Sequence, residues 1–386
     1  MLNSRISRKV AVMALCAIAG LQGCKAEQPW PLWQKYTDVF MDGSGRIVDK
    51  GAGDHTTSEG QAYAMFFALV VNDRSRFDKL LHWTEDNLAG GDMTARLPAW
   101  NWGKASDGSW KILDANSASD ADVWLAYDLL EAGRLWKVER YEKLGQVMAG
   151  RIAQSEVVSV PGIGTMLLPG PTGFHPDPTN YVLNPSYLPP QALARLALAA
   201  PAGPWGTIAD SLPQLLAKGS GGGFAMDWVL AGTTVRPSPN PQQLAEGKKD
   251  EVAVGSYDAI RVYLWLGMAD HATRGVQAAM PELGNMGAYL KTHVTPPLTV
   301  DQTGKVLNEA GTIGFSAAVI PYLLSTGRQA EAKMQMDRLG ASADPATSLY
   351  GHPPMYYDQN LALFATGWME KRFRFEKDGR LRLLWK

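Results

Sequence analysis

Residues 66–81 read FFALVVNDRSRFDKLL, and this stretch predicts two helices joined by a tight turn. Apolar residues recur at helical spacing on both sides of the polar segment NDRS. Asn, Asp and Ser are typical of turns and of helix N-termini, which favours a reversal of the chain here. The same pattern returns in AGRLWKVERYEKL (132–144) and LSTGRQAEAKM (324–334). The sequence therefore predicts a fold built from helical hairpins.

Helical spacing of apolar residues predicts twelve helices along the chain. They are expected at 33–41, 58–71, 74–89, 120–135, 138–154, 187–200, 205–218, 256–270, 274–291, 313–325, 328–339 and 354–371. A long helix is followed quickly by another and then by a longer loop, which gives six hairpins in series. Because no similarity repeats from unit to unit, as it would in a solenoid, we expect a closed double ring of helices. No linker divides residues 30–386, so residues 27–386 are expected to form a single all-α domain.

The first 26 residues have the order of a secretory signal peptide: basic residues, an apolar run of twelve residues, and small residues. The apolar run is too short for a membrane-spanning helix, which needs about 20 residues. Cleavage after Ala26 would release a periplasmic or secreted chain. Alternatively, LQGC (21–24) is a lipoprotein signal and Cys24 is the acylated anchor, although Gln22 fits that pattern poorly.

Composition excludes several classes of function. The only cysteines, Cys16 and Cys24, lie in the signal segment, so the mature chain has no thiol for an internal disulfide. A formal charge of −1 with 19% charged residues gives no basic field for a nucleic acid. The six histidines are scattered without metal-ligand spacing, so no metal is expected. GSGGGF (219–224) follows a predicted helix rather than a strand, and no G-x-S-x-G elbow occurs, so we expect no cofactor and no catalytic serine.

Three predicted helices carry acidic residues at their starts, namely Glu59, the pair Asp120 and Asp122, and Asp258. One interpretation is structural, because acids in a first turn cap a helix and favour its dipole. The other is catalytic, because hydrolysis of a glycosidic bond needs two carboxyl groups, one on each side of the bond. Small neighbours such as Gly60 leave room for a ligand, and helix starts in a ring can converge on one cleft.

Long loops on this helical scaffold are candidates for a binding surface. Residues 92–117 contain Trp100, Trp102 and Trp110 in an otherwise polar context. Such aromatics suit stacking against the apolar faces of sugar rings. They are equally consistent with anchoring of the loop, because buried Trp needs only one partner for its N–H.

The segment ASDADVWLAYDLLEAGRLW (118–136) closely resembles the signature of family 8 glycoside hydrolases. TTSEGQAYAM (56–65), NPSYLPP (184–190) and SYDAIRV (256–262) also resemble family segments, in the family's order. Leu125 replaces the Ile or Met of the signature, and Asp128 stands where a small residue is usual. Both departures lie beyond the acidic pair and bear on packing more than on chemistry. The resemblance extends from about Trp30 to Phe375.

The resemblance implies an (α/α)6 barrel of six helical hairpins, with long loops forming a substrate cleft, and an inverting endo-1,4-β-glucanase. The implied catalytic residues are the proton donor Glu59, the signature aspartate Asp120 and the general base Asp258. Because water attacks directly in an inverting mechanism, Asp120 is expected to bind sugar and tune charge rather than act as a nucleophile. The implied substrate-binding residues are Trp100, Trp102, Tyr187, Arg261 and Asp122.

Within the family, the similarity is greatest to periplasmic members that accompany a bacterial cellulose synthase. This implies a monomer that acts on β-1,4-glucan and is functionally linked to the synthase complex. The alternative substrates are mixed-linkage glucan, xylan and chitosan. A further alternative is a non-catalytic polysaccharide-binding protein of the secretion apparatus. The joint presence of Glu59, Asp120 and Asp258 argues against it, because binding alone needs no acid–base pair.

Overall fold

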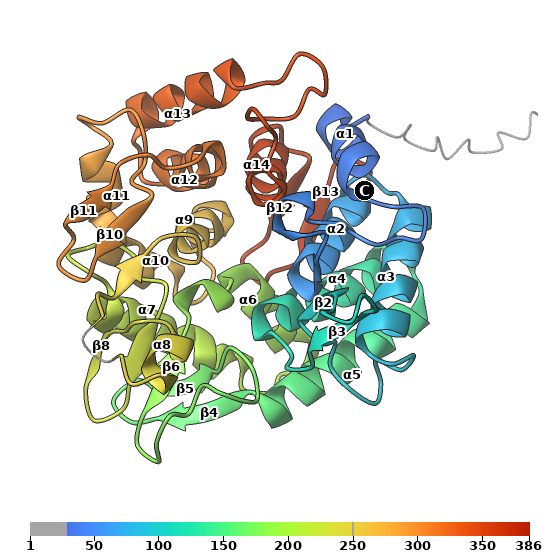
Figure 1. Ribbon diagram of the computed structural model, residues 1–386, viewed down its shortest axis with the longest axis horizontal. Coiled ribbons are helices and arrows are strands. Elements are labelled where there is room, and N and C mark those ends of the chain that lie inside the picture. Colours follow the sequence, from blue (N-terminus) through green and yellow to red (C-terminus); the bar gives the residue numbers. More distant parts are fainter. Residues whose placement is uncertain (1–28, 249–250) are drawn as a thin grey trace, which may run out of the picture.

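The computed structural model describes residues 29–248 and 251–386. The predicted signal peptide, residues 1–26, therefore lies outside the described residues. In the described part, six inner helices form a ring (Figure 1). They are α2 (Ser58–Val70), α4 (Ser119–Trp136), α6 (Pro190–Ala199), α9 (Ala259–Met268), α12 (Ile313–Ser325) and α14 (Tyr356–Met369). Each packs against the next, and the ring closes because α14 also packs against α2.

An outer layer of helices surrounds this ring (Figure 1). It consists of α1 (Pro31–Phe40), α3 (Arg74–Leu88), α5 (Glu139–Ser155), α7 (Trp205–Gly219), α10 (Val276–Ala279) with α11 (Gly284–Tyr289), and α13 (Gln329–Ala341). Most residues of the inner helices are buried, and every residue of α9 is buried. The outer helix α3 buries one apolar stripe only. The predictions of an all-α fold and of an (α/α)6 barrel are confirmed.

Two predicted helices differ from the observed elements, and proline explains both differences. The helix expected at 274–291 is divided into α10, a 3-10 turn η3 (Met280–Leu283) and α11. Pro281 in this turn has no N–H for a helical hydrogen bond, so it interrupts the helix. The helix expected at 187–200 begins only at Pro190, after a 3-10 turn η2 (Pro185–Tyr187). Pro189 and Pro190 favour extended backbone before the helix and a start at its first turn.

The long loops and the C-terminal segment contain short antiparallel sheets that the sequence did not predict. Their strands have two to five residues, too short for a clear alternating pattern. The strands are β1 (Thr56–Thr57), β2 (Asn101–Lys104), β3 (Trp110–Asp114), β4 (Val157–Val160), β5 (Gly164–Leu167), β6 (Tyr181–Leu183), β7 (Val229–Ala231), β8 (Val235–Pro237), β9 (Val254–Gly255), β10 (Thr299–Asp301), β11 (Val306–Asn308), β12 (Phe373–Phe375) and β13 (Leu381–Leu383). A 3-10 turn η1 (Lys50–Ala52) and a short helix α8 (Pro241–Ala245) complete the loops.

The inner helices all run in the same direction, because each is followed by an outer helix or hairpin that returns. The long loops precede the inner helices, so the loops and the N-terminal ends of these helices share one face. The C-terminal hairpin β12–β13 packs into the other end of the ring. There the rings of Phe373 and Phe375 lie 5.0 and 5.9 Å from that of Phe66. Within the described residues, no helix has the length and apolar character needed to cross a membrane.

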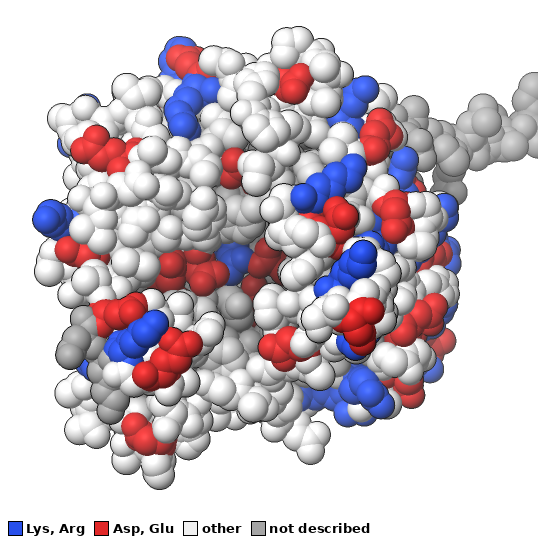
Figure 2. Space-filling view, viewed as in Figure 1, with Lys and Arg blue, Asp and Glu red and all other residues white. Residues whose placement is uncertain are grey.

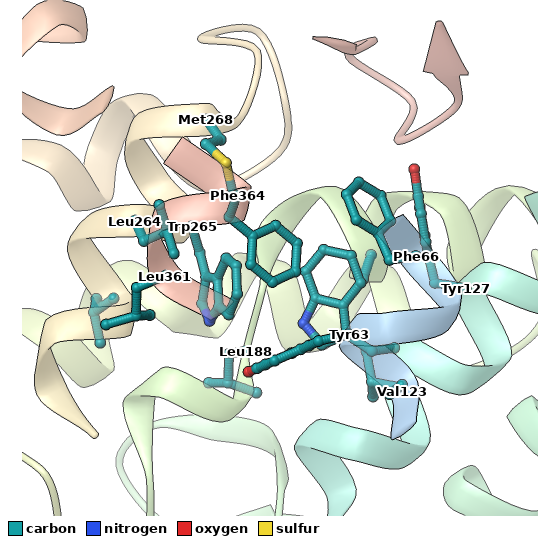
Figure 3. Close-up of a cluster of buried hydrophobic side chains, with 14 of the residues drawn as sticks. Tyr63, Phe66, Val123, Tyr127, Leu188, Leu264, Trp265, Met268, Leu361 and Phe364 are labelled. Carbon is teal, nitrogen blue, oxygen red and sulfur yellow. The ribbon is translucent and has the colours of Figure 1, made fainter. Parts of the chain in front are cut away.

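Aromatic side chains fill the interior of the ring (Figure 3). Phe364 of α14 lies at their centre, with its ring 5.0 Å from those of Tyr63 on α2 and Trp265 on α9. It also contacts the rings of Phe66 and Phe67 at 5.2 and 4.7 Å. This core joins helices from distant parts of the sequence and supports the face on which their N-termini meet.

Because Phe364 contacts several inner helices, we expect Phe364→Ala to lower the free energy of unfolding by about 3–5 kcal/mol. The control Val147→Ala removes an exposed side chain of the outer helix α5 and should change it by less than about 0.5 kcal/mol. Urea denaturation followed by circular dichroism measures both. Equal effects of the two substitutions would contradict this description of the core.

Candidate active site

The three acidic positions predicted from the sequence meet around the guanidinium of Arg261, on α9. Its Nη2 donates to Asp258 Oδ1 at 2.8 Å and to Ser186 Oγ at 3.0 Å. Its Nη1 donates to Glu59 Oε2, and its Nη2 lies 3.5 Å from Asp120 Oδ2. Arg261 is itself only 3% exposed. One buried cation therefore joins residues that are up to 202 positions apart in the sequence.

Glu59 is the second residue of α2. The helix is capped by Thr57, whose Oγ1 accepts from the Gly60 N–H at 3.1 Å. Because Thr57 fulfils the capping role, the Glu59 carboxylate is free to bind Arg261. The Glu59 side chain is 18% exposed, so it lies at the surface of the cleft rather than beneath it.

Asp258 is the residue at the N-cap position of α9, yet its side chain makes no capping hydrogen bond. Its side chain is 27% exposed, more than that of any other carboxylate that contacts Arg261. Burial of the carboxyl group raises the pKa of Asp258, while the charge of Arg261 acts in the opposite direction. Asp258 can therefore meet a solvent molecule while held by a cation.

Asp120, in the first turn of α4, is buried. Its Oδ1 accepts from the Ala121 N–H at 2.7 Å, and its Oδ2 has no hydrogen-bond partner among the described residues. Burial and the nearby Glu59 raise the pKa of Asp120 well above its usual range, and Arg261 opposes this shift. Asp120 thus lies buried beside Glu59 and Arg261, with one carboxyl oxygen that has no hydrogen-bond partner among the described residues.

Asp122 differs from the other predicted site residues, because it does not contact Arg261 and has no exposed surface. Burial first, then the charges of Glu156 and Asp120, raise the pKa of Asp122 well above its usual range. Glu156 in turn accepts from Ser117 Oγ at 2.6 Å. A direct contact between Asp122 and sugar stays a prediction, and its burial argues against one.

The predicted aromatic platform lies beside the start of α2. The carbonyl of Trp100 accepts from the Ser58 N–H at 3.0 Å, which fixes Trp100 near Glu59, and this tryptophan is 37% exposed. Trp102 instead stacks on Trp110, with ring centroids 5.2 Å apart. The guanidinium of Arg46 lies 4.5 Å from the Trp102 ring centroid, and Trp83 meets the same ring edge-on. Of the two predicted platform residues, Trp100 therefore offers the more accessible ring.

Tyr187 lies in η2, with its ring centroid 5.7 Å from Arg261 Cζ. Burial, followed by the charges of Asp120 and Asp258, raises the pKa of Tyr187 well above its usual range. The phenol therefore stays protonated and can donate a hydrogen bond near the two aspartates. This position is consistent with the predicted orienting role.

Two residues of the site were not predicted from the sequence. Asp227 lies between α7 and β7, and burial together with the charge of Asp258 raises its pKa to about 7. Tyr357, in the first turn of α14, donates from its hydroxyl to the Tyr257 carbonyl at 2.5 Å, one residue before Asp258. Asp227 opens no helix, and Tyr357 belongs to an inner helix that becomes adjacent only when the ring closes. Local pattern therefore gave no signal for either residue.

Figure 2 shows that the face viewed down the ring is hollowed near its centre. Acidic side chains line this hollow, with a basic side chain between them. Within the described residues, no group of His, Cys, Asp and Glu side chains is arranged to hold a metal ion. The chemistry available at this site is that of two accessible carboxyl groups, one buried carboxyl group and a guanidinium.

Comparison with known proteins identifies the family. The model of glycosyl hydrolases family 8 matches residues 2–371. The chain belongs to this family. Family 8 glycosyl hydrolases cleave glycosidic bonds, and the carboxyl groups around Arg261 are suited to that reaction.

Several family 8 relatives are similar over nearly the whole chain. An endoglucanase of Xanthomonas axonopodis pv. citri is 44% identical over 97% of this chain and 94% of its own length. An endoglucanase of Escherichia coli K12 is 41% identical over 96% of this chain and 95% of its own. The crystal structure of an endo-1,4-D-glucanase from Vibrio fischeri ES114 matches with a TM-score of 0.80 and 37% identity, covering 92% of this chain and 99% of that one.

We expect Arg261→Met to lower kcat/KM on a glucan by about 10²–10³-fold, because it removes the cation that orients the carboxyl groups. Since Arg261 opposes the upward shift of the Asp258 pKa, its loss should raise that pKa further. The family resemblance implies that Asp258 is the base, and a base must be ionised to act, so the acidic limb of the pH–rate profile should move to higher pH. The profile of kcat/KM against pH measures this shift.

Arg274→Met is the matched control, because it breaks an exposed ion pair with Asp210 on the outer layer. It should leave both the rate and the acidic limb unchanged. An Arg261→Met enzyme whose acidic limb stays in place would contradict the predicted effect of Arg261 on the pKa of Asp258.

Proposed function

We propose that the chain is an endo-1,4-β-glucanase that hydrolyses its substrate with inversion at the anomeric carbon. Glu59 is the general acid and Asp258 the general base in this proposal. The observation that carries it is that these two carboxylates bind different nitrogens of one guanidinium, at the accessible surface of the cleft. Each carboxylate has its own position, as the separate roles of acid and base in an inverting enzyme require.

In the proposed reaction, the Glu59 carboxyl donates its proton to the glycosidic oxygen as the bond to the anomeric carbon breaks. A water attacks that carbon from the opposite face, and Asp258 accepts the proton that this water loses. The leaving chain departs with a new hydroxyl group, and the attacked sugar has the opposite anomeric configuration. Arg261 contacts both carboxylates and stabilises the charge that moves from one side to the other.

Asp120 is assigned to sugar binding and to the charge balance of the site. Its Oδ2 has no hydrogen-bond partner among the described residues and can accept from a sugar hydroxyl. Its side chain is only 3% exposed, against 27% for Asp258, so it is less accessible to an attacking water. Asp120 therefore does not replace Asp258 as base in this proposal.

Support for β-1,4-glucan as the substrate comes from the similar proteins, which are named endoglucanases or endo-1,4-D-glucanase. The exposed Trp100 beside Glu59 provides a surface on which a sugar can stack. We further propose export to the periplasm or outside the cell, supported by the signal-like order of residues 1–26; the alternative to a soluble chain is a lipid anchor at Cys24. We also propose that the protein is a monomer and that it acts in cellulose biosynthesis.

Reducing-sugar release and viscosity test the substrate. We expect faster hydrolysis of carboxymethylcellulose than of xylan or chitosan, with an early fall in viscosity because internal bonds are cut. Proton NMR in the first minutes should detect the α-anomer, since a β-linkage is inverted. In the Glu59→Gln control, the rate should fall by about 10²–10⁴-fold.

Three results would contradict parts of the proposal. Initial release of the β-anomer would exclude inversion. A higher rate on xylan or chitosan would exclude a glucan preference. Binding of carboxymethylcellulose without hydrolysis of any of these polysaccharides would favour a non-catalytic binding protein.

A further inference from the structure

Asp227 accepts two hydrogen bonds from the backbone on either side of Asp258, the proposed base. It lies between α7 and β7, and its Oδ1 accepts from the Ser256 N–H and from the Ala259 N–H, each at 2.8 Å. These amides belong to residues on either side of Asp258. The Asp227 N–H also donates to the Val254 carbonyl at 2.9 Å, so main chain and side chain both hold the same segment.

These contacts explain why Asp258 can occupy an N-cap position without capping its helix. An aspartate at this position ordinarily turns its carboxylate toward the first free amides of the helix. Here the Ile260 N–H donates to the Ser256 carbonyl at 3.1 Å, and the Arg261 N–H donates to the Asp258 carbonyl at 3.1 Å. The remaining first-turn amide, that of Ala259, donates to Asp227.

We propose that Asp227 is a positioning residue of the reaction, which takes over the capping of α9 and thereby leaves the Asp258 carboxylate free to act as base. This inference rests on the proposed role of Asp258. Asp227 touches neither substrate nor water in this account. It acts by fixing the backbone that carries Asp258, so that one carboxylate oxygen meets Arg261 while the group remains open to solvent.

The charge state of Asp227 determines which substitution best mimics it and at which pH. Burial and the neighbouring Asp258 raise the pKa of Asp227 to about 7, so the group is mostly protonated below that pH. Arg261 acts in the opposite direction and lowers the pKa of Asp227, and the charge of Asp227 in turn raises the pKa of Tyr357. Below pH 7, Asn at position 227 would reproduce both the shape and the neutrality of the protonated carboxyl group, and its carbonyl oxygen could accept from both amides.

We expect Asp227→Asn, measured at pH 5.5–6.5, to keep kcat within about 3-fold of wild type, because the acceptor remains. Asp227→Ala removes the acceptor and should lower kcat by about 10–100-fold with KM changed by less than about 2-fold, because a misplaced base slows chemistry more than binding. Above pH 7, only the wild-type enzyme gains a charge at this position, so the ratio of the two rates, wild type to Asp227→Asn, should change with pH.

Asp73→Ala is the matched control, because Asp73 caps the outer helix α3 by accepting from the Arg76 N–H at 2.9 Å. It should lower the midpoint of thermal unfolding without changing kcat. Circular dichroism establishes which variants are folded. If Asp227→Ala does not fold, the Asp227→Asn enzyme decides: a loss of kcat as large as that of Asp258→Ala overturns the proposal, and a rate near wild type supports it.

Rescue by azide distinguishes a failure of the positioning role of Asp227 from a failure of the proposed base role of Asp258. Azide attacks without losing a proton, so it should partly restore turnover of Asp258→Ala and have little effect on Asp227→Ala, which retains its base. No rescue of Asp258→Ala would contradict the role of Asp258 itself. Rescue of Asp227→Asn or Asp227→Ala to the same extent as Asp258→Ala would make Asp227 the base and overturn the positioning role. Unchanged kcat in Asp227→Ala would also overturn it.

Discussion

The buried guanidinium of Arg261 is the constraint on which the site depends. It contacts Glu59 and Asp258 directly and lies 3.5 Å from Asp120. Three carboxyl groups brought so close together would repel one another if charged, and burial would add a desolvation cost. A single cation among them offsets both effects. It also fixes geometry, because a guanidinium donates in a planar fork with defined directions.

The double ring of helices is what brings these groups together. Inner helices α2, α4 and α9 run in the same direction, so the residues at their starts reach one face. The aromatic interior around Phe364 holds the helices at fixed spacing, and the β12–β13 hairpin packs at the opposite end. The cleft therefore opens where the long loops are. Loop residues such as Trp100 and Asp227 then complete the site from outside the ring.

Features with a local signal were predictable from the sequence. Helical periodicity and polar turns gave the hairpins, and acids at helix starts gave Glu59, Asp120 and Asp258. The functional meaning of these acids needed the family resemblance, because capping explains an acid in a first turn equally well. The break at Pro281 was foreseeable from its missing N–H, but the apolar pattern around it remained helical. Asp227 could not be found in this way, because its role depends on two amides 29 and 32 residues further along the chain.

A crystal structure of the Glu59→Gln enzyme with cellohexaose tests the central claim most directly. The account predicts a glucan chain across the hollow, with its scissile oxygen within hydrogen-bond reach of the side chain at position 59. A water should lie on the opposite face of the sugar, bonded to the Asp258 carboxylate and in line with the anomeric carbon. A glucan bound elsewhere, or a water held by Asp120 with none at Asp258, would contradict the assignment of acid and base around Arg261.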